Sequence, residues 1–308
     1  MRTFVPHRDG AAEDESQAGW GVRRAVRLEF PGPAALADDT VHTGRLRVYL
    51  TDLLRPYGLG LDPDALERGG QSYGEMAEAL IRLAVPDGES VDLLVLAYSV
   101  PDITPGRATT TYLSHVCPGG PMAFAVSDQG SAGPFTALRL LREYARTGGA
   151  RRALLLVVEQ SALPYDPGVP VTLPDRNSGV ALLFGEPGPG ERVAGLGAVT
   201  TRPLSAGPTT ADLGPLGDGP DPVTAILSAT LAAQAPALGG VKQLTVAEAG
   251  RPGTGVWWEL AGELTGELAD PAAGPRRLCL ADYDAELRCL SLATVDVGAD
   301  LPVGGRSR

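Results

Sequence analysis

The pattern of apolar and polar residues along the chain predicts alternating strands and helices. Apolar runs at residues 91–97, 122–126 and 153–158 are continuous enough for strands buried on both faces. Between the last two runs, apolar residues recur at spacings of three and four and share one helix face: Ala132, Phe135, Leu138, Leu141 and Ala145. A strand, a helix and a second buried strand form a βαβ unit, so we predict a largely parallel sheet.

The rest of the first half gives weaker signals of the same kind. Residues 22–30 and 178–184 read as strands, and residues 46–57 read as a helix. Ser72 precedes another apolar helical face and can serve as its N-cap. Residues 101–120 contain proline and glycine at both ends, and we expect a long loop there.

The second half shows a similar but less regular pattern. Residues 193–201 are predicted to form its first strand, and residues 222–234 are a helix candidate. Three short apolar runs, at residues 244–247, 277–281 and 287–295, are strand candidates. Because each half contains a strand, a helix and a strand in that order, a weak internal duplication is predicted.

The composition of successive segments suggests where the chain divides. Residues 8–19 are polar and acidic, and residues 1–20 are expected to form a flexible extension. The stretch at residues 185–190 is rich in glycine and proline and marks a boundary between two halves. We therefore expect a first half at residues 21–188, a shortened second half at residues 189–297, and a flexible tail at residues 298–308.

Charge and composition exclude several classes of function. The 308-residue chain has a formal net charge of -11, and its only lysine is Lys242. Such a chain is poorly suited to bind nucleic acid without sequence preference. It contains no apolar stretch of membrane-spanning length and no apolar signal core, and its three cysteines are too scattered for a disulfide framework. We expect a cytoplasmic protein without nucleic-acid or membrane partners.

Candidate chemistry centres on Ser131. It follows the run at residues 122–126 and a turn that contains glycine, and a predicted helix begins just after it. Backbone N–H groups converge at a helix N-terminus, so an acyl oxygen would be stabilised there. A serine needs a general base to attack a thioester, and His115 is the histidine nearest in sequence. Ser131 can be a nucleophile or a small packing residue, and His115 can be its base or an exposed or interface residue.

Other chemically conspicuous residues have simpler interpretations. Cys117 lies before the strand at residues 122–126 and can be a reactive thiol or an unreactive pocket or interface thiol. The pair Trp257 and Trp258 is expected to pack on an amphipathic surface rather than bind a cofactor. The segment at residues 185–190 lacks the lysine and hydroxyl residue of a phosphate-binding loop. No cofactor and no metal are predicted.

Several blocks of sequence, in order, resemble the thiolase superfamily, and most of all its β-ketoacyl-ACP synthase III branch. In that family a strand ends in Val-Ser-Ala-Ala-Cys-Ala-Gly-Phe. Here Val126-Ser127-Asp128-Gln129-Gly130-Ser131-Ala132-Gly133 stands before Phe135, and Ser131 falls on the family's cysteine with one extra residue before it. The resemblance covers about residues 70–185, with further matching blocks at residues 75–79, 91–95, 112–121, 148–160 and 178–184.

This resemblance implies an α/β fold, namely a thiolase-like layered fold of two related βαβ-containing halves. It also implies dimerisation through residues 122–126. Acyl-ACP and acyl-CoA thioesters are the substrate class that it implies.

The departures from the family pattern concern its catalytic groups. The family condenses acyl chains with a cysteine and with a histidine and an asparagine from its second half. Here the histidines are His7, His42 and His115, all in the first half, and Glu248 or a neighbour stands at the family's histidine position. Residues 282–286 replace a glycine-rich loop, and an ionised carboxylate repels an oxyanion.

Three functional hypotheses follow. The first is a non-condensing subunit of bacterial polyketide or fatty-acyl secondary metabolism, which pairs with an active ketosynthase, or with itself, and shapes the acyl pocket. The second is an acyltransferase or thioesterase that uses Ser131 on acyl-ACP or acyl-CoA. The third is a module that binds an acyl chain or an acyl carrier protein without chemistry.

Overall fold

A computed structural model describes residues 19–33, 35–62, 71–104, 108–214, 223–234, 240–269 and 274–298. The predicted extension at residues 1–20 and tail at residues 298–308 lie almost entirely outside these ranges. The strands of the first half are β1 (Gly21–Glu29), β2 (Leu93–Ala97), β3 (Met122–Val126), β4 (Ala153–Glu159) and β5 (Ser178–Gly185). Those of the second half are β6 (Ala194–Pro203), β7 (Val223–Leu227), β8 (Gln243–Val246), β9 (Arg276–Asp284) and β10 (Cys289–Val297).

Helices alternate with these strands, as the apolar spacing predicted for α5. The first half contains η1 (Ala35–Asp38), α1 (Thr40–Leu54), η2 (Arg55–Tyr57), α3 (Tyr73–Ala84), α4 (Thr109–Val116), η3 (Gly130–Ala132) and α5 (Gly133–Arg146). The second half contains α6 (Thr210–Leu213), α7 (Ala229–Gln234) and α8 (Gly255–Ala269). No helix within the described ranges is both long and apolar enough to cross a lipid bilayer.

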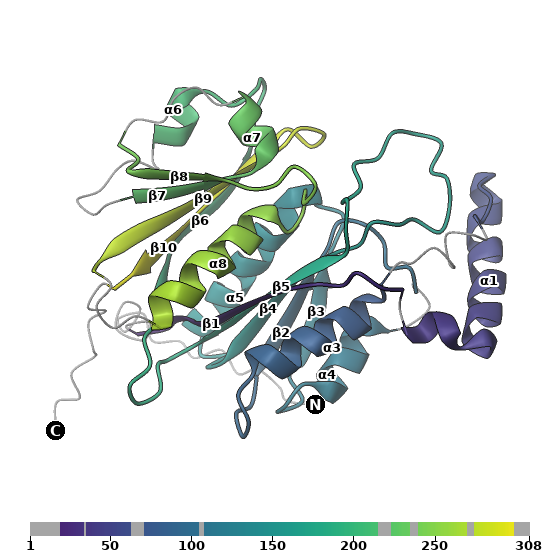
Figure 1. The fold of residues 1–308 in the computed structure, drawn as a ribbon, viewed down its shortest axis with the longest axis horizontal. Helices are drawn as coiled ribbons and strands as arrows, with labels where there is room; N and C mark the ends of the chain where they lie inside the picture. The colour runs from purple at the N-terminus through teal and green to yellow at the C-terminus, as the bar shows by residue number, and fades with distance from the viewer. Residues whose placement is uncertain are drawn as a thin grey trace.

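The strands form one sheet in the order β3-β2-β4-β5-β1-β6-β10-β9-β7-β8 (Figure 1). Read inwards from its two edges, the order is β3-β2-β4-β5-β1 and β8-β7-β9-β10-β6, so the second half repeats the first. Strand directions repeat as well, since β2 runs parallel to β3 and β4, and β7 runs parallel to β8 and β9. The expected α/β architecture of two related βαβ-containing halves is confirmed.

The sheet is mixed, and the prediction of a largely parallel sheet is wrong. The pairs β4–β5, β5–β1, β1–β6, β6–β10 and β10–β9 are antiparallel. The reason is the connection between strands, because a parallel neighbour needs a helical crossover and an antiparallel neighbour does not. The chain passes from β4 to β5 through residues 160–177 without a helix, and from β9 to β10 through a tight turn.

Two central helices hold the halves together. Helix α5 contacts β2 and β4 of its own half as well as β6 and β10, and α8 contacts β7 and β9 as well as β1 and β5. The rings of Phe135 on α5 and Trp257 on α8 meet edge to face, with centroids 4.9 Å apart. Trp257 is completely buried, so the expectation that it packs on a surface is wrong. Figure 1 shows both helices between the half-sheets, with α3 and α4 outside one and α6 and α7 near the other.

Residues 101–120 are not a continuous loop, because α4 occupies residues 109–116. The run of three threonines that begins this helix has low helix propensity, which hides it from sequence reasoning. Leu113 is fully buried in the apolar cluster that α3 contributes to, and this packing stabilises the helix.

Two further predictions need correction: the helix at residues 222–234 and the capping of α3 by Ser72. In the expected helix at residues 222–234, Val223–Leu227 forms strand β7, buried along its whole length, and only Ala229–Gln234 is helical. Its β-branched residues favour a strand buried on both faces. Ser72 occupies the N-cap of α3 without capping it through its side chain. Asp102 Oδ1 accepts the Tyr73 N–H instead, at 3.4 Å.

The helix expected at residues 46–57 begins earlier than predicted. It starts at Thr40, because the Asp39 side chain accepts the N–H groups of Val41 and His42, both at 3.0 Å. Its last predicted turn is the separate helix η2.

Candidate functional site

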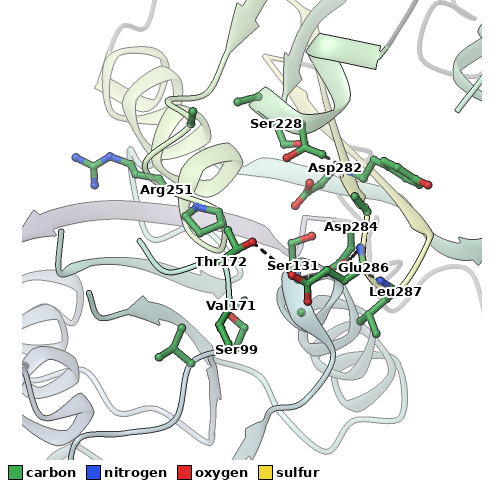
Figure 2. A pocket seen from close by; sticks show the side chains of 18 of the residues that line it. Ser99, Ser131, Val171, Thr172, Ser228, Arg251, Asp282, Asp284, Glu286 and Leu287 are labelled. Carbon is green, nitrogen blue, oxygen red and sulfur yellow. Dashed lines mark hydrogen bonds between the residues drawn. The ribbon is translucent and has the colours of Figure 1, made fainter. Parts of the chain in front are cut away.

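A pocket of about 360 Å³ lies where several strands of both halves end. Its lining comes from the segments after β2, β3, β7, β8 and β9, and from the loop at residues 160–177. Ligands of α/β sheets bind at this place, outside the carboxyl ends of the strands. Figure 2 shows Ser131 in the middle of the pocket, with Asp282 and Ser228 on one side and Asp284 and Glu286 close by.

Ser131 reaches the pocket through a strained turn. Asp128 and Gly130 both have left-handed backbone conformations, with φ of 60° and 50°. Such angles are uncommon for a residue with a side chain and cluster at functional sites. The turn places Ser131 in η3, directly before the 14-residue helix α5, as the sequence predicted.

Asp284 occupies the N-terminal end of this helical segment. Its Oδ2 accepts the backbone N–H of Ser131 at 3.0 Å, and its Oδ1 accepts the N–H groups of Glu286 and Leu287 at 3.0 and 2.9 Å. A Cβ atom placed on Gly130 would overlap Asp284 Oδ2. The carboxylate of Asp284 therefore fills the space towards which a side chain at position 130 would point.

Asp282, two residues earlier on β9, is buried at 3% exposure. Burial raises the pKa of this carboxyl to about 6, and hydrogen bonds from the hydroxyls of Ser228 and Ser131 offset only part of that effect. The Ser131 hydroxyl therefore shares the pocket with a carboxyl whose pKa lies close to neutral pH. A carboxylate in that range can accept a proton from a neighbouring group.

The pocket carries a strongly negative charge. Five carboxylate side chains line it: Asp128, Glu248, Asp282, Asp284 and Glu286. Arg251 is the one basic side chain among the lining residues that the structure describes. It forms ion pairs with Glu29 and Glu248 and stacks on Trp258, with 3.8 Å from the guanidinium carbon to the ring centroid. Figure 2 shows its guanidinium directed away from Ser131, so the carboxylates near Ser131 stay uncompensated.

His115 is exposed on α4 and is not among the described residues that line the pocket. The structure therefore does not bring it to Ser131. Burial raises the pKa of the Cys117 thiol to about 12, which keeps the thiol protonated and unreactive. Glu248 lies at the rim, 58% exposed, and pairs with Arg251 and Arg176.

The N-terminus of α8, the second central helix, lies at the same pocket and is also capped by a carboxylate. Glu159, at the end of β4, is 1% exposed and accepts the N–H groups of Gly253 and Thr254 at 2.8 and 3.2 Å. It also accepts the hydroxyls of Ser178 and Thr254. Both central helices therefore have their N-terminal N–H groups engaged by side chains of this chain, Glu159 at α8 and Asp284 just before α5.

Sequence reasoning missed two of these residues, Ser228 and Glu159. Ser228 gave no signal because it stands in a segment predicted to be helical. Glu159 read as the polar end of an apolar run, and its partners lie about a hundred residues away in sequence. The sequence did mark residues 282–286 as replacing a glycine-rich loop, but their contact with Ser131 spans 153 positions. Among the described residues, no group of three or more His, Cys, Asp or Glu could hold a metal ion.

Comparison with known proteins identifies the class of fold. No protein-family model and no curated protein matches the sequence. The solved structure of AbyA1, a tetronic acid condensing enzyme, is 22% identical, covers 90% of this chain and 99% of its own, and has a TM-score of 0.54. The acyltransferase ChlB3 is 18% identical, covers 92% and 99%, and has a TM-score of 0.55.

A third solved structure is 3-oxoacyl-(acyl carrier protein) synthase III, FabH, from Pseudomonas aeruginosa. It is 15% identical, covers 91% of this chain and 98% of its own, and has a TM-score of 0.51. The chain therefore has the same thiolase-like α/β fold as these enzymes, as the sequence blocks implied.

Proposed function

We propose that this protein is a synthase III-like subunit that does not itself carry an acyl group, and that it pairs with an active ketosynthase and shapes its acyl pocket. One observation carries the proposal, namely the Asp284 carboxylate on the backbone N–H of Ser131. Acyl transfer develops negative charge on the acyl oxygen, and the nucleophile's own N–H is a common donor to that oxygen. Here a fixed anion already holds that donor.

The remaining groups of the pocket support the same proposal. Among its described lining residues there is neither a histidine nor a cysteine. Asp282, Asp284 and Glu286 line the pocket around Ser131, and ionised carboxylates there would repel an oxyanion. The named neighbours include condensing enzymes and an acyltransferase, so the fold is compatible with acyl chemistry while these side chains oppose it.

The edge strand β3 is the surface that we assign to pairing. It is the outermost strand of the first half, and its residues Met122 and Ala125 are exposed. An open strand edge offers backbone groups to a further strand. The family resemblance implies dimerisation through this same strand.

The test is co-expression with an active β-ketoacyl-ACP synthase III from the same organism. We expect the two proteins to co-elute in gel filtration and the partner's acyl-chain preference to change when this subunit is present. Ala125→Arg on β3 should abolish co-elution, whereas Val169→Arg, on the exposed loop after β4, should leave it intact. A stable monomer that leaves the partner's product lengths unchanged would overturn the proposal.

A second candidate function rests on Ser131 and Asp282. The Ser131 hydroxyl shares the pocket with a buried carboxyl whose pKa is raised to about 6, and a serine acyltransferase or thioesterase requires a base near its nucleophile. Intact-protein mass after incubation with acyl-CoA and acyl-ACP tests it. An acyl adduct on the wild type that Ser131→Ala lacks would establish this function and displace the first.

A further inference from the structure

The pocket holds two of the three elements of acyl transfer in usable form. Ser131 supplies a hydroxyl, and the Asp282 carboxyl lines the same pocket beside it. The third element, a free N–H donor for the acyl oxygen, is present in the Ser131 backbone but bonded to Asp284 at 3.0 Å. The backbone donor is therefore in place, and it is the hydrogen bond to Asp284 that prevents it from binding an acyl oxygen.

We propose that Asp284 is an internal blocking group, and that its removal leaves Ser131 able to accept an acyl group from a thioester. This inference rests on the proposed function, since it explains why the native chain carries no acyl group. Three backbone N–H groups hold the Asp284 carboxylate, two in its own turn and one at Ser131. A substrate oxygen would have to displace an anion that is anchored on both of its oxygens.

The position of Gly130 supports the same inference independently. Its φ of 50° directs a Cβ at that position into Asp284 Oδ2. Any side chain at residue 130 would displace the carboxylate, and glycine is the residue that permits the contact. The conformation of Gly130 and the absence of a side chain there therefore both permit Asp284 to reach the Ser131 N–H.

Once Asp284 is removed, acyl transfer from a thioester to Ser131 requires no cofactor. The Ser131 Oγ forms a bond to the thioester carbonyl carbon, and the carbon–sulfur bond breaks. The proton of Oγ passes to the Asp282 carboxylate and then to the leaving thiolate, which departs as a thiol. The freed Ser131 N–H donates to the carbonyl oxygen while it carries negative charge.

The experiment uses the full-length protein with a neutral probe, because the pocket would repel the phosphates of coenzyme A. The probe is the hexanoyl thioester of N-acetylcysteamine, and the readout is intact mass followed by peptide mapping. Two variants are compared with the wild type. Asp284→Ala removes the carboxylate completely, and Asp284→Ser retains a hydroxyl that can still accept the N–H groups of the turn. Glu286→Gln is the matched control, since it removes a neighbouring carboxylate that does not bond Ser131.

We expect both Asp284 variants to gain one hexanoyl group on Ser131, at a rate about a hundredfold above the wild type, the usual effect of one oxyanion donor. The control variant Glu286→Gln should label much more slowly than either Asp284 variant, because it lowers the local negative charge without freeing the Ser131 N–H. Adding Ser131→Ala to Asp284→Ala should abolish the label. A cooperative thermal transition identifies the Asp284 variants that are folded. If a folded Asp284 variant gains no label, the inference is overturned. Equal labelling of Glu286→Gln would overturn it too, since a general loss of negative charge would then be the cause. Rapid labelling of the wild type would overturn both the inference and the proposed function, whereas unlabelled Asp284 variants overturn the inference alone, which separates the two failures.

Discussion

Asp282 and Asp284 stand two residues apart at the end of one strand, and their surroundings differ in a way that sets their roles. Asp284 is held in place by three backbone N–H groups. Asp282 is buried, so its charged form is poorly solvated and its pKa is raised. The first residue is therefore fixed in position by the backbone, and the second titrates near neutral pH.

Asp282→Asn should stabilise the protein at neutral pH and not in acid. The folded-state pKa of about 6 lies above the ordinary value of 3.8, so the folded protein holds this proton more tightly than the unfolded chain. The penalty for ionising Asp282 is absent below about pH 4, grows as the pH rises between the two pKa values, and is complete above about pH 7. We expect the free energy of unfolding of Asp282→Asn to exceed that of the wild type by up to about 3 kcal/mol at pH 8.

Urea unfolding at several pH values between about pH 4 and pH 8 measures this difference. The exposed Asp87→Asn on the turn after α3 serves as the control and should follow the wild type at every pH. If the difference in the free energy of unfolding between Asp282→Asn and the wild type did not change with pH, the raised pKa of Asp282 would be contradicted.

Among the elements, the two central helices matter most, because their N-termini both face the pocket and both are capped from a neighbouring strand end. Glu159 caps α8 with contacts to two backbone N–H groups and two hydroxyls. A carboxylate that is buried away from water needs such hydrogen-bond donors. Burial nevertheless raises the pKa of Glu159. The loop between β8 and α8 is thereby fixed to β4.

Glu159→Ala should lower the free energy of unfolding by about 3 kcal/mol, because it leaves the N–H groups of Gly253 and Thr254 buried without an acceptor. Glu159→Gln should cost much less. Its amide oxygen can face the two N–H groups, while the hydroxyls of Ser178 and Thr254 turn to accept its N–H₂ group. Chemical denaturation of both variants tests this difference.

The matched control is Glu143→Ala on α5, where an exposed pair with Arg146 is lost and less than about 0.5 kcal/mol should change. Equal losses for Glu159→Ala and Glu159→Gln would show that Glu159 fills space rather than caps the helix.

The elements also show how far sequence reasoning reaches. Continuous apolar runs such as Ala153–Glu159, and the helical spacing of α5, were predicted because local pattern and burial agree there. Helix α4 and strand β7 were not predicted, because tertiary packing around Leu113 and Val223 overrides weak or ambiguous local signals. Ser131 could be found from the turn and helix around it. Its contacts with Asp282 and Asp284 could not, because a hydrogen bond across about 150 positions leaves no periodic trace.

At the scale of the whole molecule, the two halves share one core. The sheet itself joins them through only two residue pairs between β1 and β6, Gly21 with Gly195 and Val22 with Ala194. The larger connection is the apolar cluster around α5 and α8, which contains residues of both half-sheets. Neither half can bury its own central helix without the strands of the other.

Separating the chain after residue 188 should therefore leave two fragments that do not fold alone. Each fragment would expose one side of its half-sheet and one face of its central helix, and burial of apolar surface dominates stability. We expect neither fragment to show a sigmoidal urea transition by far-UV circular dichroism, and the intact chain to show a single one. A cooperative transition in residues 189–308 alone would contradict the shared core, and co-refolding of the two fragments is the control for damage from the cut.

The repeated strand order has a consequence for how this cavity could have changed during evolution. Two copies of one topology meet so that equivalent segments, α5 with η3 in one and α8 in the other, deliver their N-termini to the same space. The sheet supplies those positions whatever side chains stand there, so selection on a few loop residues can rewrite the chemistry while the scaffold stays intact. A descendant that gained or lost acyl chemistry would then differ from its ancestor mainly at strand ends, and far less in its core.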